Sequence, residues 1–374
     1  MKDQPDWYQF NNSEKIDTPA LLIYSERVIS NINRLKQMVS SPSLLRPHVK
    51  TNKSVKVSRL MMDAGITKFK CATIAEAEML GRAGAPDVLL AYQPTLVKLE
   101  RFIQLILAYP KTTYSCLVDN ETTADMISLV AGLNNLIIPV CIDLNVGMNR
   151  TGIIPEKALK LFYYLTTLSG IKFKGLHAYD GHIEDLNLTD RTIHCEKEFE
   201  PVEKLRKNIQ GLGYPLPLLI AGGSPTFAIH AKRANTECSP GTFVFWDKGY
   251  QEHIPEQSFL FAAIVLARVV SLPDETKICI DLGYKSISSE KPLQNRFYFL
   301  NAPHLKPYSQ SEEHLVIEVG QGHEYKIGDE FYVLPMHICP TVAMYDEAHI
   351  IEKGTYTQKW PIDARGRALK PVDN

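Results

Sequence analysis

Lys50 ends a short segment, RPHVK (46–50), whose composition is typical of a buried β-strand. A lysine in this place either lies in a solvated loop or presents a desolvated amine that can attack a carbonyl carbon and form an imine. Side chains alternate along a strand, so His48 and Lys50 point to the same side. The segment therefore predicts a reactive amine at Lys50, with Lys53 as the second candidate.

Two glycine turns further along the chain could hold a phosphate group. Adjacent glycines let a backbone approach a ligand closely, and hydroxyl and freed N–H groups can donate to its oxygens. Most turns of this kind are plain turns, and only their position opposite a reactive amine would distinguish these two. The residues concerned are Gly222, Gly223, Ser224 and Thr226 in AGGSPTF (221–227), and Gly241 and Thr242 in CSPGTF (238–243).

Two more segments end strand candidates in polar residues. DLNVGMNRTG (143–152) carries Arg150, which is either a solvated surface arginine or a fixed cation near a ligand oxygen. In HAYDGH (177–182), His177 and Tyr179 alternate and should face one side, where they could contact a ligand; for Tyr179, core packing is the competing interpretation. His182 is a candidate acid or base.

His337 and Cys339 lie two residues apart in PMHICPT (335–341), a segment expected to be a strand. Both side chains would then point to one face, and imidazole plus thiolate suits zinc. Two protein ligands would leave positions open for water and substrate, as in catalytic sites. The alternative is ordinary burial. Further support for the metal could come from Glu313, His314 or Asp346.

The elements that must position these residues alternate between strands and helices. Strands are expected at 46–50, 68–72, 88–92, 114–118, 139–145, 173–179, 217–223 and 236–242, with helices at 54–65, 73–84 and 156–170 among those between them. Eight such units predict a (β/α)8 barrel over residues 25–250, which places Lys50 and both glycine turns at strand ends on the active face. A doubly wound open sheet is the alternative, but no N-terminal G-x-G-x-x-G supports it.

The pattern changes after residue 250. Strand-like runs separated by turns follow, without a long helix, and they predict a mostly β domain over residues 251–374. KIDTPALLIYS (15–25) contains a strand that should join it, so residues 1–24 are assigned to the same domain.

Composition excludes several classes of protein. The chain has 374 residues and a formal net charge of −1, so no overall basic field favours nucleic acid or an anionic membrane. Seven scattered cysteines argue against a disulfide framework. The N-terminal residues lack the pattern of a signal peptide, and we expect a cytoplasmic protein.

Seven segments together resemble a known family. RPHVKTNK, DLNVGMNRTG, HAYDGH, AGGSPTF, ECSPGTFVFWD (237–247), DLGYKSISSE (281–290) and HICPT, in this order, resemble the D-threonine aldolase and D-serine dehydratase group. These are fold-type III pyridoxal-phosphate enzymes related to alanine racemase.

The resemblance implies that Lys50 holds the cofactor, that Arg150 contacts it, and that His337 and Cys339 bind a divalent metal, zinc or manganese. It also implies a homodimer with a barrel and a β domain. Asn52 and Tyr284 depart from the family pattern, in which histidine is usual, and this leaves the substrate in doubt.

The activity expected first is D-threonine aldolase: retro-aldol cleavage of a D-β-hydroxy amino acid to glycine and an aldehyde. Dehydration of D-serine or 3-hydroxyaspartate is the alternative, because a metal could equally polarise the hydroxyl as a leaving group. An amino-acid racemase and a non-catalytic pyridoxal-phosphate-binding protein are the remaining alternatives. The β domain with its metal pair argues against the last.

Overall fold

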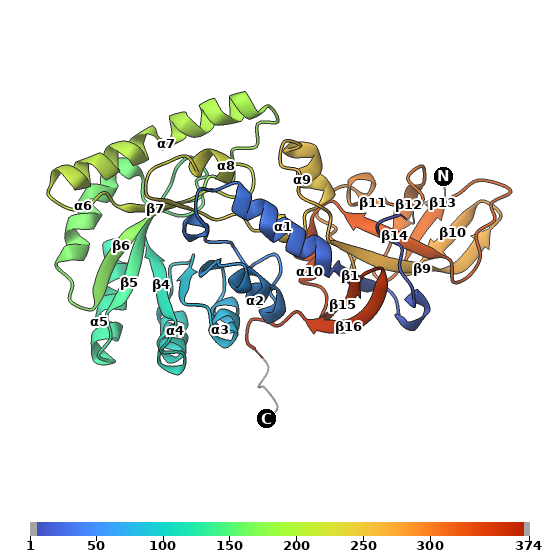
Figure 1. The fold of residues 1–374 in the computed structure, drawn as a ribbon, viewed down its shortest axis with the longest axis horizontal. Helices are drawn as coiled ribbons and strands as arrows, with labels where there is room; N and C mark the ends of the chain where they lie inside the picture. The colour runs from blue at the N-terminus through green and yellow to red at the C-terminus, as the bar shows by residue number, and fades with distance from the viewer. Residues whose placement is uncertain (1–5, 370–374) are drawn as a thin grey trace. The chain divides into compact units, whose positions relative to one another are not determined.

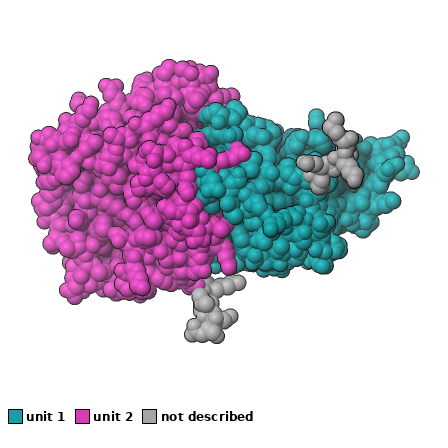
Figure 2. Space-filling view, in the orientation of Figure 1, with its two compact units in different colours: residues 1–33, 51–54, 242–365 teal, residues 34–50, 55–241, 366–374 magenta. Residues whose placement is uncertain are grey.

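A computed structural model describes residues 6–369 (Figure 1). The chain divides into two compact units, coloured separately in Figure 2. Unit 1 comprises residues 1–33, 51–54 and 242–365, and unit 2 comprises residues 34–50, 55–241 and 366–374. Helix α1 (Ser25–Gln37) carries the chain from the first unit into the second.

Unit 2 is built on a parallel sheet in the order β2-β3-β4-β5-β6-β7-β8. Its strands are β2 (Lys68–Cys71), β3 (Asp87–Leu90), β4 (Thr113–Val118), β5 (Ile138–Leu144), β6 (Ile171–Ala178), β7 (Leu218–Ala221) and β8 (Thr236–Cys238). The helices between them are α2 (Val55–Asp63), α3 (Ile74–Ala83), α4 (Leu96–Ala108), α5 (Glu121–Leu133), α6 (Pro155–Thr166), α7 (Leu188–Gly211) and α8 (Phe227–His230). Seven of the predicted strands and all three predicted helices are confirmed.

The eighth strand of the prediction, 46–50, is not a regular strand. Residues 45–49 form isolated bridges that join the two edges of the sheet: Arg46 N donates to Cys238 O at the end of β8, and Val49 N donates to Lys70 O in β2. Pro47 has no N–H group, which weakens a continuous ladder. The segment nevertheless closes the sheet into the predicted barrel.

Local sequence explains where the helices begin. Thr73 Oγ1 accepts from Glu76 N at 3.1 Å, and the Glu76 carboxylate accepts from Ala72 N at 2.6 Å, so a capping box starts α3. Asn120 and Asn187 accept in the same way at the starts of α5 and α7.

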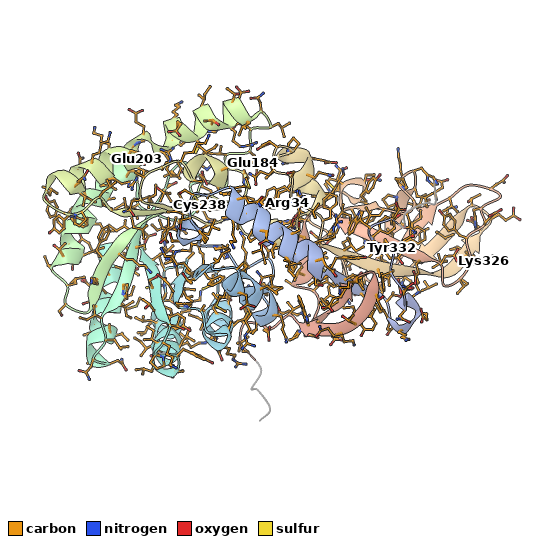
Figure 3. All side chains as sticks on the ribbon, in the orientation of Figure 1. Arg34, Glu184, Glu203, Cys238, Lys326 and Tyr332 are labelled. Atoms are coloured by element: carbon orange, nitrogen blue, oxygen red, sulfur yellow. The ribbon has the colours of Figure 1, made fainter. Side chains whose placement is uncertain are left out.

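Unit 1 is the predicted β domain. Its sheet runs β12-β13-β10-β9-β1-β15-β16, and β14 pairs with β9 and β11. The predicted N-terminal strand, β1 (Ala20–Tyr24), pairs antiparallel with β9 (Ala263–Asp274) and parallel with β15 (Glu347–Glu352). The other strands are β10 (Lys277–Ile280), β11 (Phe297–Phe299), β12 (Lys306–Gln310), β13 (Leu315–Glu318), β14 (Glu330–Pro335) and β16 (Thr355–Pro361). Figure 3 labels Tyr332 in β14, which packs in a core cluster with Leu22 and Leu266.

A buried ion-pair network fixes the segment that leads to Lys50. Arg46 is fully buried; its Nε lies 2.6 Å from Glu237 Oε2, and its Nη1 lies 2.8 Å from Asp87 Oδ1. Glu237 belongs to β8 and Asp87 to β3, so one guanidinium links the closing segment to two strands.

Replacing Arg46 with methionine should lower the free energy of unfolding by about 3 kcal/mol, because it removes the buried charge shared by Glu237 and Asp87 and leaves these carboxylates to Lys68 and Lys174 at the rim of the network. Urea denaturation measures this change. Lys172→Met, at an exposed position of β6, is the control and should change it by less than about 0.5 kcal/mol. A loss below about 1 kcal/mol for Arg46→Met would contradict the role given to the network.

Candidate active site

A cavity of about 640 Å³ opens at the carboxyl ends of the strands of unit 2. This volume suits a cofactor-sized molecule. The lining includes His48, Lys50, Arg150, His177 and Tyr179 from the predicted site, so the structure brings these residues together. Lys70, Gln93, Asp119, Asp143 and Thr151 line it as well.

Lys50 and Lys53 have different surroundings. Lys50 lines the cavity, with its Nζ 5.8 Å from the centre of the Tyr179 ring. Lys53 belongs to unit 1, where its Nζ donates to Ala364 O at 3.4 Å. Lys50 therefore belongs to the same unit as the cavity, where a carbonyl ligand would bind, whereas Lys53 does not.

The Tyr179 ring has three cationic neighbours. Besides Lys50, Lys70 Nζ lies 5.5 Å and Arg150 Cζ 5.0 Å from its centre. Arg150 follows β5 in the polar segment 145–152, as the sequence predicts. This arrangement favours a flat, negatively charged ligand against the ring.

His177 and Asp143 form a hydrogen-bonded pair because they are partners in register on β6 and β5. His177 Nδ1 lies 2.7 Å from Asp143 Oδ1. Asp143 Oδ2 accepts from Gln93 and Thr151 at 2.8 and 2.9 Å. Burial disfavours the charged carboxylate, but the hydrogen bonds from His177, Thr151 and Gln93 outweigh it and lower the pKa of Asp143. Burial lowers the pKa of His177, so its ring is neutral.

The first glycine turn leaves little room for side chains at Gly222 and Gly223. Gly222 has a φ of +77°, and a Cβ there would lie 2.9 Å from His230 Cδ2. A Cβ on Gly223 would lie 3.1 Å from Tyr179 Cε2. The turn therefore needs glycine at Gly222 and lies beside the tyrosine that faces the cavity.

The buried carboxylate of Asp180 holds this turn through two hydrogen bonds. Asp180 Oδ1 accepts from Thr226 Oγ1 at 2.9 Å, and Asp180 Oδ2 lies 2.8 Å from His230 Nε2. Arg233 Nε donates to His230 Nδ1 at 3.1 Å, so the imidazole proton is on Nε2 and is donated to Asp180. Thr226 thus directs its hydroxyl proton to Asp180.

Asp180, Cys195 and His230 are the one group in residues 6–369 whose three ligand atoms lie within 4.8 Å of one another. Both nitrogens of His230 are engaged in hydrogen bonds, and burial raises the pKa of the Cys195 thiol to about 12. These atoms are satisfied by one another, and the set is a structural cluster that holds the turn.

His337 and Cys339 come together in unit 1, but not as neighbours on a strand. Strand β14 ends at Pro335, His337 is the N-cap of the short helix α10 (Ile338–Val342), and Cys339 lies within that helix. The expectation of a strand here is wrong because the chain turns into a helix after Pro335. The two side chains meet across this helix start through a hydrogen bond.

Glu290 is the third candidate donor, although the ligand atoms of His337, Cys339 and Glu290 do not all lie within 4.8 Å of one another. Its carboxylate contacts His337 Nδ1. Burial favours the neutral imidazole, but the hydrogen bonds and charges of Cys339 and Glu290 outweigh it and raise the pKa of His337 to about 9. Nitrogen, sulfur and oxygen donors in a negative environment fit a divalent cation such as zinc. The side chains expected to support the metal lie elsewhere: Asp346 pairs with Arg365 at 2.8 Å, and Glu313 lies 3.5 Å from Lys285.

Three other predicted residues, His182, Gly241 and Thr242, are not among those that line the cavity. His182 does not line the cavity; its ring lies beside Gly147 and His194. Gly241 is the last residue of segment 55–241 of unit 2. It follows β8, whose last residue, Cys238, is labelled in Figure 3. Thr242 begins the next stretch of unit 1, where its hydroxyl lies 3.6 Å from Cys339 Sγ.

Sequence reasoning missed several residues of the site. Lys70, Asp143 and Gln93 line the cavity, and Glu290 contacts His337. Strand alternation could have indicated Lys70, since Lys68 and Lys70 flank the buried Phe69 on β2. No spacing rule leads from His337 to Glu290, which lies 47 residues earlier.

A parallel β/α barrel with a lysine-lined cavity, joined to a β domain, defines the class of alanine racemase-like proteins. Residues 23–248 match the family "Alanine racemase, N-terminal domain", and residues 262–351 match "Putative serine dehydratase domain". The chain belongs to the alanine racemase N-terminal domain family, in its D-threonine aldolase and D-serine dehydratase-like group of fold-type III pyridoxal-phosphate enzymes.

Curated relatives cover nearly the whole chain. The D-threonine aldolase of Arthrobacter sp. is 24% identical over 360 residues, covering 94% of this chain and 93% of the relative. The D-threo-3-hydroxyaspartate dehydratase of Delftia sp. (strain HT23) is 25% identical over 374 residues, with coverages of 92% and 97%. The crystal structure of D-threonine aldolase from Filomicrobium marinum superposes with a TM-score of 0.86 at 24% identity, covering 94% and 96% of the two chains. None of the helices in residues 6–369 is long and apolar enough to cross a membrane.

Proposed function

We propose that the chain is a pyridoxal-phosphate- and metal-dependent lyase acting on D-β-hydroxy amino acids, and specifically a D-threonine aldolase. The observation that carries the proposal is the cavity in which Lys50, Arg150, His177 and Tyr179 meet. Relatives that cover more than nine-tenths of the chain are named as a D-threonine aldolase and a hydroxyaspartate dehydratase, which supports a lyase.

The residues present fit pyridoxal phosphate. Lys50 would bind the cofactor aldehyde through Nζ, and Tyr179 and Arg150 would help to hold the cofactor. The Gly222–Gly223 turn, with Ser224, would receive the phosphate. When bound, the cofactor provides an electron sink for the electrons released at Cα.

His337 and Cys339, with Glu290 beside His337, would hold the divalent metal, which when bound would acidify the β-hydroxyl of the substrate. Cys339 Sγ lies 3.0 Å from Thr51 Oγ1, and Thr51 follows Lys50 in the chain. In the aldolase reaction the Cα–Cβ bond would break and one proton would move overall from the β-hydroxyl to Cα, where Lys50 would deliver it. Glycine and an aldehyde result. The homodimer and the cytoplasmic location stay predictions from the sequence.

Dehydration is the second candidate, because the Delftia relative is named as a dehydratase. In that reaction Lys50 removes the Cα proton and the β-hydroxyl leaves as water, giving a keto acid and ammonia. Purified protein with pyridoxal phosphate and zinc or manganese should be tested on D-threonine, D-serine and D-threo-3-hydroxyaspartate. Glycine and aldehyde as products support the aldolase, whereas keto acid and ammonia contradict it in favour of the dehydratase.

The phosphate-binding role of the 222–226 turn can be tested by changing Asp180, whose carboxylate holds this turn in place. Asp180→Asn keeps the size of the side chain but loses an acceptor for His230 or Thr226, so the 222–226 turn should loosen. The dissociation constant for pyridoxal phosphate, measured by absorbance titration, should rise about tenfold, as for one unmade buried hydrogen bond. Asp185→Asn, at a carboxylate that lies 2.8 Å from the half-exposed His194, is the control. An unchanged affinity in Asp180→Asn would overturn the link between the carboxylate and the turn.

A further inference from the structure

Lys70 is a buried lysine on the inner face of the barrel. It is 2% exposed and lies on β2, next to the segment that leads to Lys50: its backbone N donates to Pro47 O, and its O accepts from Val49 N, both at 2.9 Å. Its side chain lines the same cavity as that of Lys50.

The contacts of Lys70 do not neutralise its charge. Its Nζ lies 3.5 Å from His177 Nε2. Because His177 donates its Nδ1 proton to Asp143, Nε2 carries a lone pair and accepts from Lys70. In the part of the chain that the structure describes, Lys70 forms no ion pair with a carboxylate. A buried ammonium whose acceptor is a neutral imidazole is costly unless an anion joins it.

The surroundings of Lys70 are otherwise positive. Arg150 and Lys50 share its cavity, and the two carboxylates there, Asp119 and Asp143, are already bound by neighbours such as Gln93. Burial and the charges of Lys50 and Arg46 lower the pKa of Lys70 to about 7, against the opposing charges of Asp180 and Asp143. A bound anion would favour the protonated form.

We propose that Lys70 is an anion-binding residue of this cavity, whose ammonium group donates to an oxyanion of the ligand held at Lys50. The proposal rests on the proposed function, because that function places the ligand at Lys50. The oxyanion is either an oxygen of the cofactor or the carboxylate of the substrate. In both cases Lys70 links the ligand through His177 to Asp143.

The test uses Lys70→Met, which keeps most of the length and the apolar character of the side-chain stem but removes the charged group. If the anion belongs to the cofactor, the dissociation constant for pyridoxal phosphate should rise about 10–100-fold, as expected for a lost charge-assisted hydrogen bond. If it belongs to the substrate, cofactor affinity should stay the same and the affinity of the holoenzyme for glycine and acetate should fall by that factor. Lys172→Met, exposed on β6, is the control and should change neither.

Proton uptake gives a readout that a merely structural lysine would not change. Calorimetry at pH 8, in two buffers of different ionisation enthalpy, should show that ligand binding takes up more protons in the wild type than in Lys70→Met. Lys70→Arg should restore affinity, and Lys70→Gln replaces the methionine variant if that variant misfolds.

If Lys70→Met has the same affinities and proton uptake as a wild type that binds the cofactor at Lys50, the role of Lys70 is overturned and the proposed function is not. A wild type that borohydride does not label at Lys50 would overturn the proposed function and this proposal together.

Discussion

Lys50→Ala should lose the covalently held cofactor and at least about 10³-fold of its turnover, because in the proposed function the Lys50 amine both binds the cofactor and moves the proton at Cα. Lys50 lines the cavity beside Tyr179. The wild-type protein should show the absorbance of the lysine-bound cofactor. After borohydride reduction, peptide mapping should find the cofactor on the peptide that contains Lys50.

The matched control is Lys53→Ala. Lys53 is three residues away and donates to Ala364 O, so its loss should leave the absorbance and labelling unchanged. A label on Lys53 or Lys70, or normal turnover in Lys50→Ala, would refute the assignment. Because labelling is independent of turnover, it also tests the cofactor apart from the identity of the substrate.

Losing the metal site should have the second largest effect. His337→Ala removes one of the three candidate donors and should lower turnover about 100-fold or more, because a bound Lewis acid would stabilise the charge that develops at the β-oxygen. Chelation of the wild type should have the same effect. The absorbance of the cofactor should stay in both cases, since Lys50 and the 222–226 turn lie in the other unit.

Metal content, measured by elemental analysis, should fall with turnover in His337→Ala and in Cys339→Ser. Glu313→Gln is the control, because Glu313 pairs with Lys285 and not with His337. Chelated protein that cleaves D-threonine and dehydrates D-serine at full rate would contradict the proposal. The activity would then have to be sought in racemisation, which needs no Lewis acid at a β-oxygen.

The sequence alone determined most of the fold. Buried apolar strands alternate with capped helices, and this pattern reflects local physical chemistry: the period of a strand or helix and the Thr73 cap can be recognised without distant contacts. The same pattern put Lys50, Arg150, His177 and Tyr179 at strand ends, and parallel strands bring their carboxyl ends to one face. Those four residues therefore meet in one cavity, as the pattern implies.

Only the tertiary structure decided which partners these residues have. Asp143 is 34 residues from His177, Glu290 is 47 from His337, and His230 is 50 from Asp180, so no local period connects them. The helix that begins after Pro335 also depends on its surroundings, since Asp247 accepts from Ile338 N at its start. Lys70 also shows what the sequence could not decide. The sequence places Lys70 on a strand, but its burial and the charges around it are properties of the assembled barrel interior. That Lys70 has no carboxylate partner is therefore visible only when its neighbours in the described structure are known.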